Sequence, residues 1–213
     1  MELTPQDLTP QDLTPHDRLR VSEAIREAEG RTDGEIVCVV ARSSSDYSFY
    51  PVVWAALAAL CAPWPLIELT RLTVQRIFIL QLVVFIAALL VLSLPRLRML
   101  LVPRPVQRGR AHRAAMEQFV IRGMSRTRER TGVLIFVSLA ERYARIVADE
   151  GISNMVPQAA WQSAVDRLIA DCREGRVGDG LVAAVGVCGD VLAHQFPLRA
   201  DHANELPDKV YVI

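Results

Sequence analysis

The stretch EIVCVVA, residues 35–41, decides the fold class of this chain, because it is a nearly continuous run of β-branched and other apolar residues. Such a run is typical of a strand that is buried on both faces of a sheet. A strand of this kind needs neighbours, and the next candidates, GVLIFVS at 132–138 and RYARIVA at 142–148, follow only after two long apolar segments. The sequence therefore predicts one α/β domain that is interrupted after its first strand.

The link between the second and third predicted strands sets their relative direction. It runs from Leu139 to Glu141. A parallel crossover needs about a dozen residues, so these two strands are predicted to be antiparallel neighbours. The closing segment NELPDKVYVI, 204–213, is predicted to add a short edge strand.

Four helices are predicted around these strands from their apolar periodicity, over 18–29, 107–130, 157–174 and 179–194. The first has Thr14 as its cap and Asp17 in its first turn. Its predicted apolar face holds Leu19, Ala24, Ile25 and Ala28. The residues before it repeat the pentapeptide LTPQD, LTPQD, LTPHD, and we expect this segment, 1–17, to be disordered apart from the cap in its last copy. The first two copies are expected to be dispensable, and the alternative is a motif that binds a partner.

Two apolar segments, 51–69 and 77–94, have nearly the length that crosses a bilayer as a helix, about 20 residues. A short link joins them, so we predict a transmembrane hairpin over 51–95. The competing interpretation is a pair of buried core helices. It is disfavoured because a domain of this size does not easily enclose two helices that are apolar all round.

Arginines follow the second apolar segment directly, in the stretch 96–105 that we interpret as a basic juxtamembrane linker. The positive-inside rule then places both flanks of the hairpin in the cytoplasm, and so both termini of a multi-pass inner-membrane protein. No secretory signal is visible in the first residues. The position of the arginines next to a span favours contact with lipid head groups over nucleic acid. The predicted head-group contacts are Arg96, Arg98, Arg104 and Arg108.

Polar residues at the ends of the strands are the candidate site residues, because ligands of open α/β sheets bind outside the carboxyl ends of strands. Asp46 and Ser138 follow the first and second strands. Asp149 and Glu150 follow the third, and with Asp179 at the start of the last helix they offer hard oxygen ligands for Ca²⁺ or Mg²⁺. The alternative is a solvated turn. The cysteines and histidines have no metal-binding spacing, and a disulfide framework is not expected.

Several segments together resemble the TPM domain family, in its bacterial membrane branch with a hairpin inserted in the domain. They are AIREAEGRTDGEIVCVV, TGVLIFVSLAERYARIVADEGI, GDGLVAAV, LAHQFP and NELPD. The resemblance covers 18–50 and 106–213. It implies a three-layer α/β/α sandwich around a small mixed sheet, with acid phosphatase activity in some members and calcium binding in others. Asp149 matches the Asp-x-Gly that follows a strand in the family.

The residues do not form a recognisable catalytic motif. We therefore expect a membrane-anchored, non-catalytic module that binds a membrane or membrane-associated partner protein, or a divalent cation, in membrane protein assembly or maintenance. The alternative is a metal-dependent membrane-bound phosphatase that uses a metal near Asp149.

Overall fold

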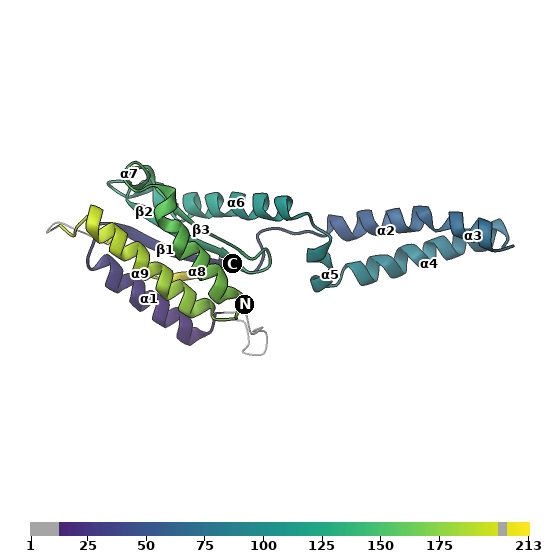
Figure 1. The fold of residues 1–213 in the computed structure, drawn as a ribbon, viewed down its shortest axis with the longest axis horizontal. Coiled ribbons are helices and arrows are strands. Elements are labelled where there is room, and N and C mark those ends of the chain that lie inside the picture. The colour runs from purple at the N-terminus through teal and green to yellow at the C-terminus, as the bar shows by residue number, and fades with distance from the viewer. Residues whose placement is uncertain (1–12, 200–203) are drawn as a thin grey trace. The chain divides into compact units, whose positions relative to one another are not determined.

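The computed structural model describes residues 13–199 and 204–213, without the side chains of Pro95 and Arg96 (Figure 1). Most of the predicted disordered repeat therefore lies outside the described residues. The described chain divides into two compact units. One runs up to Ser44 and resumes at Arg108, and the other is the inserted segment Ser45–Gln107.

A mixed sheet forms the centre of the first unit. The described residues contribute four strands to it in the order β3-β2-β1-β4. Strand β1 lies parallel to β2, with Ala41 opposite Ser138, and β3 runs antiparallel to β2 as predicted. The predicted edge strand is also confirmed, since β4 pairs with β1 in parallel. The bounds are β1 Glu35–Ala41, β2 Gly132–Ser138, β3 Tyr143–Ala148 and β4 Val210–Val212.

Helices cover both faces of this sheet, which confirms the predicted three-layer sandwich (Figure 1). On one face lie α1 Pro15–Glu29, α8 Gln162–Arg173 and α9 Val177–Gln195. On the other lies α6 Arg104–Ile121, whose Ala115 and Phe119 pack against the side chains of β1 and β2 that point that way. Successive side chains of a strand point to opposite faces, so two covered faces explain why β1 and β2 are buried along their whole length.

Helix α1 begins at the predicted cap. The Thr14 hydroxyl accepts the backbone N–H of Asp17 at 3.1 Å, and the Asp17 carboxylate accepts the backbone N–H of Thr14 at 3.3 Å. This reciprocal capping box satisfies two amides that the first turn leaves without helical partners. The predicted apolar face is correct at Ile25 and Ala28 but wrong at Leu19, which is 65% exposed.

Glu29 is a buried carboxyl group at the end of α1 that joins this helix to β1. Its Oε1 accepts the backbone N–H of Ile36 at 2.7 Å. Burial raises the pKa of Glu29 to about 9, against the lowering effect of the Ile36 hydrogen bond, and the nearby charges of Glu35 and Asp208 add to the rise. The carboxyl group is therefore protonated at neutral pH, which is how a carboxyl group is accommodated in an apolar environment.

The predicted helix over 107–130 was wrong at both ends, because α6 begins earlier, at Arg104, and ends at Ile121. Gly123 has φ +77°, in the left-handed region, and a single 3-10 turn, η2 Met124–Arg126, follows it. The residues after 121 are largely Arg, Glu, Met and Thr, and several of these are good helix formers. A local preference for helix was therefore overridden where the chain turns toward β2.

The other two predicted helices are present with small changes at their starts. The segment 157–174 opens with a 3-10 turn, η3 Gln158–Trp161, before α8. The last helix, α9, extends beyond the predicted 179–194 by a few residues at the start and by Gln195 at the end. Trp161, Val165 and Leu168 are buried as the predicted stripe requires.

The inserted unit is a hairpin of helices (Figure 1). Helices α2 Phe49–Cys61 and α3 Pro63–Leu69 form one arm, and α4 Val74–Leu92 packs beside them as the other. A short helix, α5 Pro95–Leu100, follows within the predicted linker 96–105, so that linker is partly helical. Only Pro51, Ala55 and Ala59 of α2 are buried, and no residue of α4, all of which the structure describes, is buried.

Among the described residues, three helical segments are long and apolar enough to cross a membrane: Phe49–Leu69, Val74–Leu92 and Val177–Gln195. The last of these is α9, whose apolar stretch is half buried against the sheet. The apolar stretches of the other two are 11% and 0% buried. The apolar side chains of α9 thus belong to the core of the first unit, whereas those of the inserted hairpin lie on its surface.

Candidate functional site

The parallel pairing of β1 and β2 brings the ends of both strands to the same edge of the sheet. Ser138 ends β2 directly opposite Ala41 of β1, and Ser43 and Ser44 follow in the loop after β1. The Ser44 hydroxyl donates to the Ser138 hydroxyl at 2.8 Å. Ser138 therefore contacts the loop that follows β1 at this edge of the sheet.

Glu141 completes this cluster. Its Oε1 accepts the backbone N–H of Ser44 at 2.9 Å and the Ser43 hydroxyl at 3.3 Å, and its Oε2 accepts the Ser138 hydroxyl. Ser138 is fully buried and Glu141 is 7% exposed. Because the Ser138 hydroxyl is buried and engaged as both donor and acceptor, the cluster ties the β1 loop to the β2–β3 turn and does not present a nucleophile to solvent.

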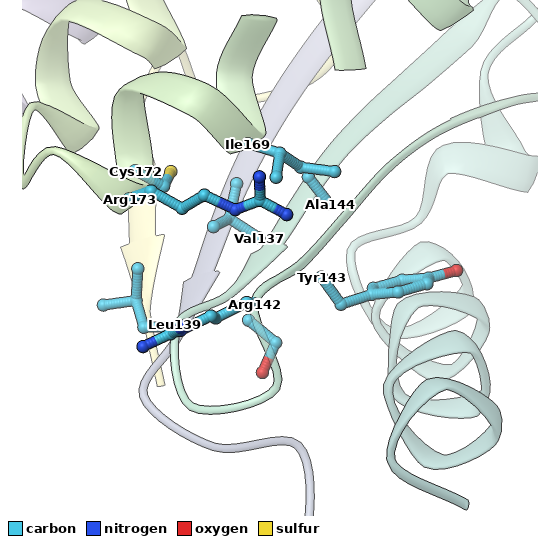
Figure 2. Close-up of a pocket in the computed structure, with 9 residues that line it drawn as sticks. Val137, Leu139, Arg142, Tyr143, Ala144, Ile169, Cys172 and Arg173 are labelled. Carbon is cyan, nitrogen blue, oxygen red and sulfur yellow. The ribbon is translucent and has the colours of Figure 1, made fainter. Parts of the chain in front are cut away.

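A cavity of about 180 Å³ lies beside this cluster, between the end of β2, the start of β3 and α8. Its apolar lining consists of Val137, Leu139, Ala144, Ile169 and Cys172, and Ser138 and the start of β3 at Tyr143 border it as well. Figure 2 shows Ile169 and Ala144 facing each other, and the ring of Tyr143 turned away from the other labelled side chains.

Two arginines also line this cavity, Arg142 from the β2–β3 turn and Arg173 from the last turn of α8. In Figure 2 the Arg173 side chain extends past Val137 toward Ala144 and Ile169, while Arg142 ends near Leu139. Over the part of the chain that the structure describes, neither guanidinium has a hydrogen-bond or ion-pair partner. The two acids nearest in sequence to Arg173, Asp171 and Glu174, both pair with Arg176.

Asp149 and Glu150 lie at the opposite edge of the sheet, where β2 begins. The backbone N–H of Asp149 donates to the carbonyl of Gly132 at 2.9 Å, and Asp149 caps the short helix α7 Glu150–Ser153 by accepting the Glu150 N–H at 2.7 Å. Glu150 forms an ion pair with Arg130. Asp149 is 8% exposed, and its Oδ2 is buried without a hydrogen-bond partner among the described residues.

Asp179 is not brought to Asp149 and Glu150. It lies at the start of α9, 2.9 Å from the Arg20 Nη1 atom of α1. The other end of α9 is the one that approaches the start of β1, where Leu192 packs against Gly34. With a rise of about 1.5 Å per residue, the helix separates Asp179 from Leu192, and so from the edge of the sheet where β1 begins, by roughly 20 Å.

In the described residues there is no group of three or more His, Cys, Asp or Glu side chains that could hold a metal ion. All four cysteines are free thiols. Burial raises the pKa of Cys172, on the cavity wall, to about 11 and that of Cys188 to about 12. Binding of Ca²⁺ or Mg²⁺ by Asp149, Glu150 or Asp179 stays a prediction.

The remaining candidates lie mainly in the inserted unit. Asp46 accepts the backbone N–H of Ser48 at 3.0 Å and lies 3.6 Å from the Arg98 Nη1 atom. Arg104 and Arg108 are exposed in the first turns of α6, as lipid contact requires, while the side chain of Arg96 lies outside the described part of the chain. Contact of these arginines with lipid head groups stays a prediction.

Sequence reasoning missed Glu141, Arg142 and Arg173 as site residues. In the sequence, Glu141 was interpreted only as part of the short link between two strands. An acid three residues after a serine that ends a strand nevertheless has the spacing that places both side chains in one turn. Arg142 has φ +51°, and a non-glycine residue in this left-handed region is uncommon and is not marked by its residue type. The cavity itself joins segments far apart in the sequence.

The chain is similar to known proteins in two comparisons. The family model described as the TPM domain matches residues 89–191, which include β2, β3, α8 and most of α9. The NMR structure of the BA42 protein from the psychrophilic bacterium Bizionia argentinensis is similar with a TM-score of 0.60 and 20% sequence identity, over 94% of this chain and 95% of that chain. At this identity the likeness shows the fold. No curated protein matches the chain.

Proposed function

We propose that this chain is a membrane-anchored member of the TPM domain family, in the bacterial branch with a hairpin inserted in the domain. The α/β unit is then a cytoplasmic, non-catalytic binding module that acts on membrane protein assembly or maintenance through a partner protein or a cation. The match of 89–191 to the TPM domain supports the family. The position of the hairpin between β1 and β2 supports the branch.

The observation that carries the proposal is the apolar surface of the inserted hairpin. Large apolar side chains are exposed along both arms, including Leu57, Leu60, Phe78, Val83 and Ile86. Each buried apolar side chain of this size contributes about 1.5–3 kcal/mol relative to exposure in water. Contiguous exposed apolar surface of this kind marks a site of interaction with a membrane or a protein. A bilayer can cover all sides of both helices, whose backbone groups are already hydrogen-bonded within each helix.

The charges at the ends of the hairpin support its orientation. Arg98, Arg104 and Arg108 follow α4, whereas the other end of the hairpin has Arg71 in the connection of residues 70–73 and Arg76 in the first turn of α4. The positive-inside rule then places the α/β unit in the cytoplasm and the 70–73 connection on the other side. The test is to locate that connection and the C-terminus relative to the membrane. We expect the two on opposite sides, and finding both on one side would rule out a spanning hairpin.

The second candidate function is a metal-dependent phosphatase, and two observations favour it. The name of the matching family model links the TPM domain with phosphatase activity. The Oδ2 atom of Asp149 is a buried carboxylate oxygen without a hydrogen-bond partner in the described chain. Buried polar atoms are rarely left unsatisfied, and a bound cation is one way to satisfy such an oxygen.

The two candidates differ in the expected effect of Asp149→Asn on the purified full-length protein. For the non-catalytic module we expect no metal-stimulated turnover of p-nitrophenyl phosphate by the wild type. For the phosphatase we expect Ca²⁺- or Mg²⁺-dependent turnover that falls about a hundredfold or more in Asp149→Asn, because one charged ligand is lost. Asp166→Asn is the matched control, since this acid of α8 is exposed and bonds only to Gln162 in the described structure. Turnover that is lost equally in both variants would contradict a site at Asp149.

A further inference from the structure

We propose that the cavity between β2, β3 and α8 binds a small organic carboxylate with an apolar part of about five or six carbon atoms. The carboxylate lies against the guanidinium group of Arg173, and the apolar body lies against the apolar lining of the cavity. Arg142, which borders the cavity near Leu139, adds a second positive charge. This inference rests on the cavity and not on the membrane anchor, so it and the proposed function can each fail alone.

The size and lining of the cavity define the apolar part of the ligand. Its volume is about 180 Å³. A dry protein cavity of about 150 Å³ lined by apolar side chains accommodates benzene, so this one takes a body of that size or slightly larger. Val137, Ala144, Ile169 and Cys172 offer no charged group, and the Ser138 hydroxyl is already bonded to Ser44 and Glu141. A polar body would therefore find few partners inside.

The two arginines define the charged part. Both line the cavity, and within the described residues neither has an acidic or hydrogen-bonding partner. Two other guanidinium groups, of α8 and of the α8–α9 turn, are different. Arg176 pairs with Asp171 and Glu174, and Arg167 lies 3.9 Å from Asp171. The unpaired planar guanidinium group of Arg173 at an apolar cavity matches a carboxylate, which accepts paired N–H donors from arginine. Arg142 adds positive charge at the border of the same cavity.

The backbone at this site favours a carboxylate over a phosphate group. Phosphate sites in α/β proteins are usually built from free backbone N–H groups of a loop or a helix start. Here three N–H groups of the turn are used within the protein. Leu139 and Ala140 donate to the carbonyls of Ala41 and Arg42, both at 3.0 Å, and Arg142 donates to the carbonyl of Leu139 at 3.2 Å. The arginine side chains are left as the available donors.

The backbone of Arg142 gives a second, independent indication. Its φ of +51° is a conformation that glycine adopts without strain and that other residues adopt at a cost. Strained positions of this kind cluster at binding sites, where the side chain has a role that offsets the cost. Arg142→Gly should therefore raise the melting temperature of the protein while it weakens binding of the carboxylate. If Arg142 had only a structural role, its replacement by glycine would not raise the melting temperature and weaken carboxylate binding at the same time.

The experiment uses full-length protein in nanodiscs of a zwitterionic lipid, with empty nanodiscs as the blank. The probe is 6,6,6-trifluorohexanoate, followed by ¹⁹F NMR, and 6,6,6-trifluorohexan-1-ol is the neutral probe of the same shape. We expect the wild type to bind the carboxylate at least tenfold more tightly than the alcohol. Arg173→Gln should weaken carboxylate binding about tenfold or more, which is the loss of one charge-assisted contact. Arg142→Gly should weaken it by a smaller factor, because a nearby positive charge is lost and not a direct contact.

Arg167→Gln is the matched control, because Arg167 lies on the same helix as Arg173, is 74% exposed and does not line the cavity. We expect its affinity for the carboxylate to stay within twofold of the wild type. Four results would overturn the proposal: no binding by the wild type, equal binding of the alcohol, unchanged binding in both cavity variants, or tighter binding of hexyl phosphate than of hexanoate in competition.

Discussion

Val83→Arg is expected to remove most of the protein from the carbonate-resistant membrane fraction. Val83 lies at the middle of α4 and is 53% exposed, so in a spanning hairpin its side chain faces lipid. Arginine at the centre of a transmembrane helix costs about 2.5–3.5 kcal/mol on insertion scales, whereas valine is slightly favourable. A difference of about 3 kcal/mol lowers the insertion equilibrium roughly a hundredfold.

Two control variants separate insertion from general damage. Val83→Leu keeps an apolar side chain at the same position and should leave the membrane fraction unchanged. Val120→Arg places the same charge on a valine of α6 that is 64% exposed in the α/β unit, and it should also have no effect. Equal extraction of Val83→Arg and Val83→Leu would contradict the placement of α4 in lipid.

Gly151→Ala is expected to destabilise the α/β unit by about 2–3 kcal/mol, the cost of forcing a carbon atom into a close-packed site. A Cβ atom at Gly151 would lie 2.6 Å from the carbonyl oxygen of Glu129 and 2.7 Å from that of Arg130. Both atoms belong to the backbone, so neither moves aside without a shift of the chain before β2. Thermal unfolding in nanodiscs should show a melting temperature lowered by about 5–10 °C.

Gly186→Ala is the matched control for this substitution. Gly186 lies within α9, and a Cβ atom there would meet nothing within 4 Å. Replacing a glycine inside a helix by alanine stabilises by about 0.5–1 kcal/mol, so the melting temperature should rise slightly. If Gly151→Ala were as stable as the wild type, the close approach of α7 to the segment before β2 would be wrong.

Local rules explain which parts of the fold are predictable from the sequence. The apolar runs of β1 and β2 mark buried strands, and the short link between β2 and β3 permits only an antiparallel pair. The Thr14 and Asp17 pair marks the start of α1. Each of these signals depends on residues that are close together in the sequence, and each prediction is confirmed.

The features that the sequence did not predict correctly depend instead on tertiary contacts between residues far apart in the sequence. The helix predicted through 107–130 ends early where the chain must turn into β2. The ion pair between Asp179 and Arg20, which are far apart in sequence, was not predicted. The cavity combines a turn at Arg142 with a helix end at Arg173. Only the folded chain brings these together.

The side of the membrane on which each end of the hairpin lies tests the central claim most directly. One epitope is placed between Arg71 and Leu72, in the connection between α3 and α4, and another after Ile213. Their accessibility to an impermeant antibody or protease is compared in right-side-out and inside-out vesicles. A membrane-anchored module predicts the first epitope on the outer side and the second on the cytoplasmic side. Both epitopes on the same side, or the C-terminal epitope on the outer side, would contradict it.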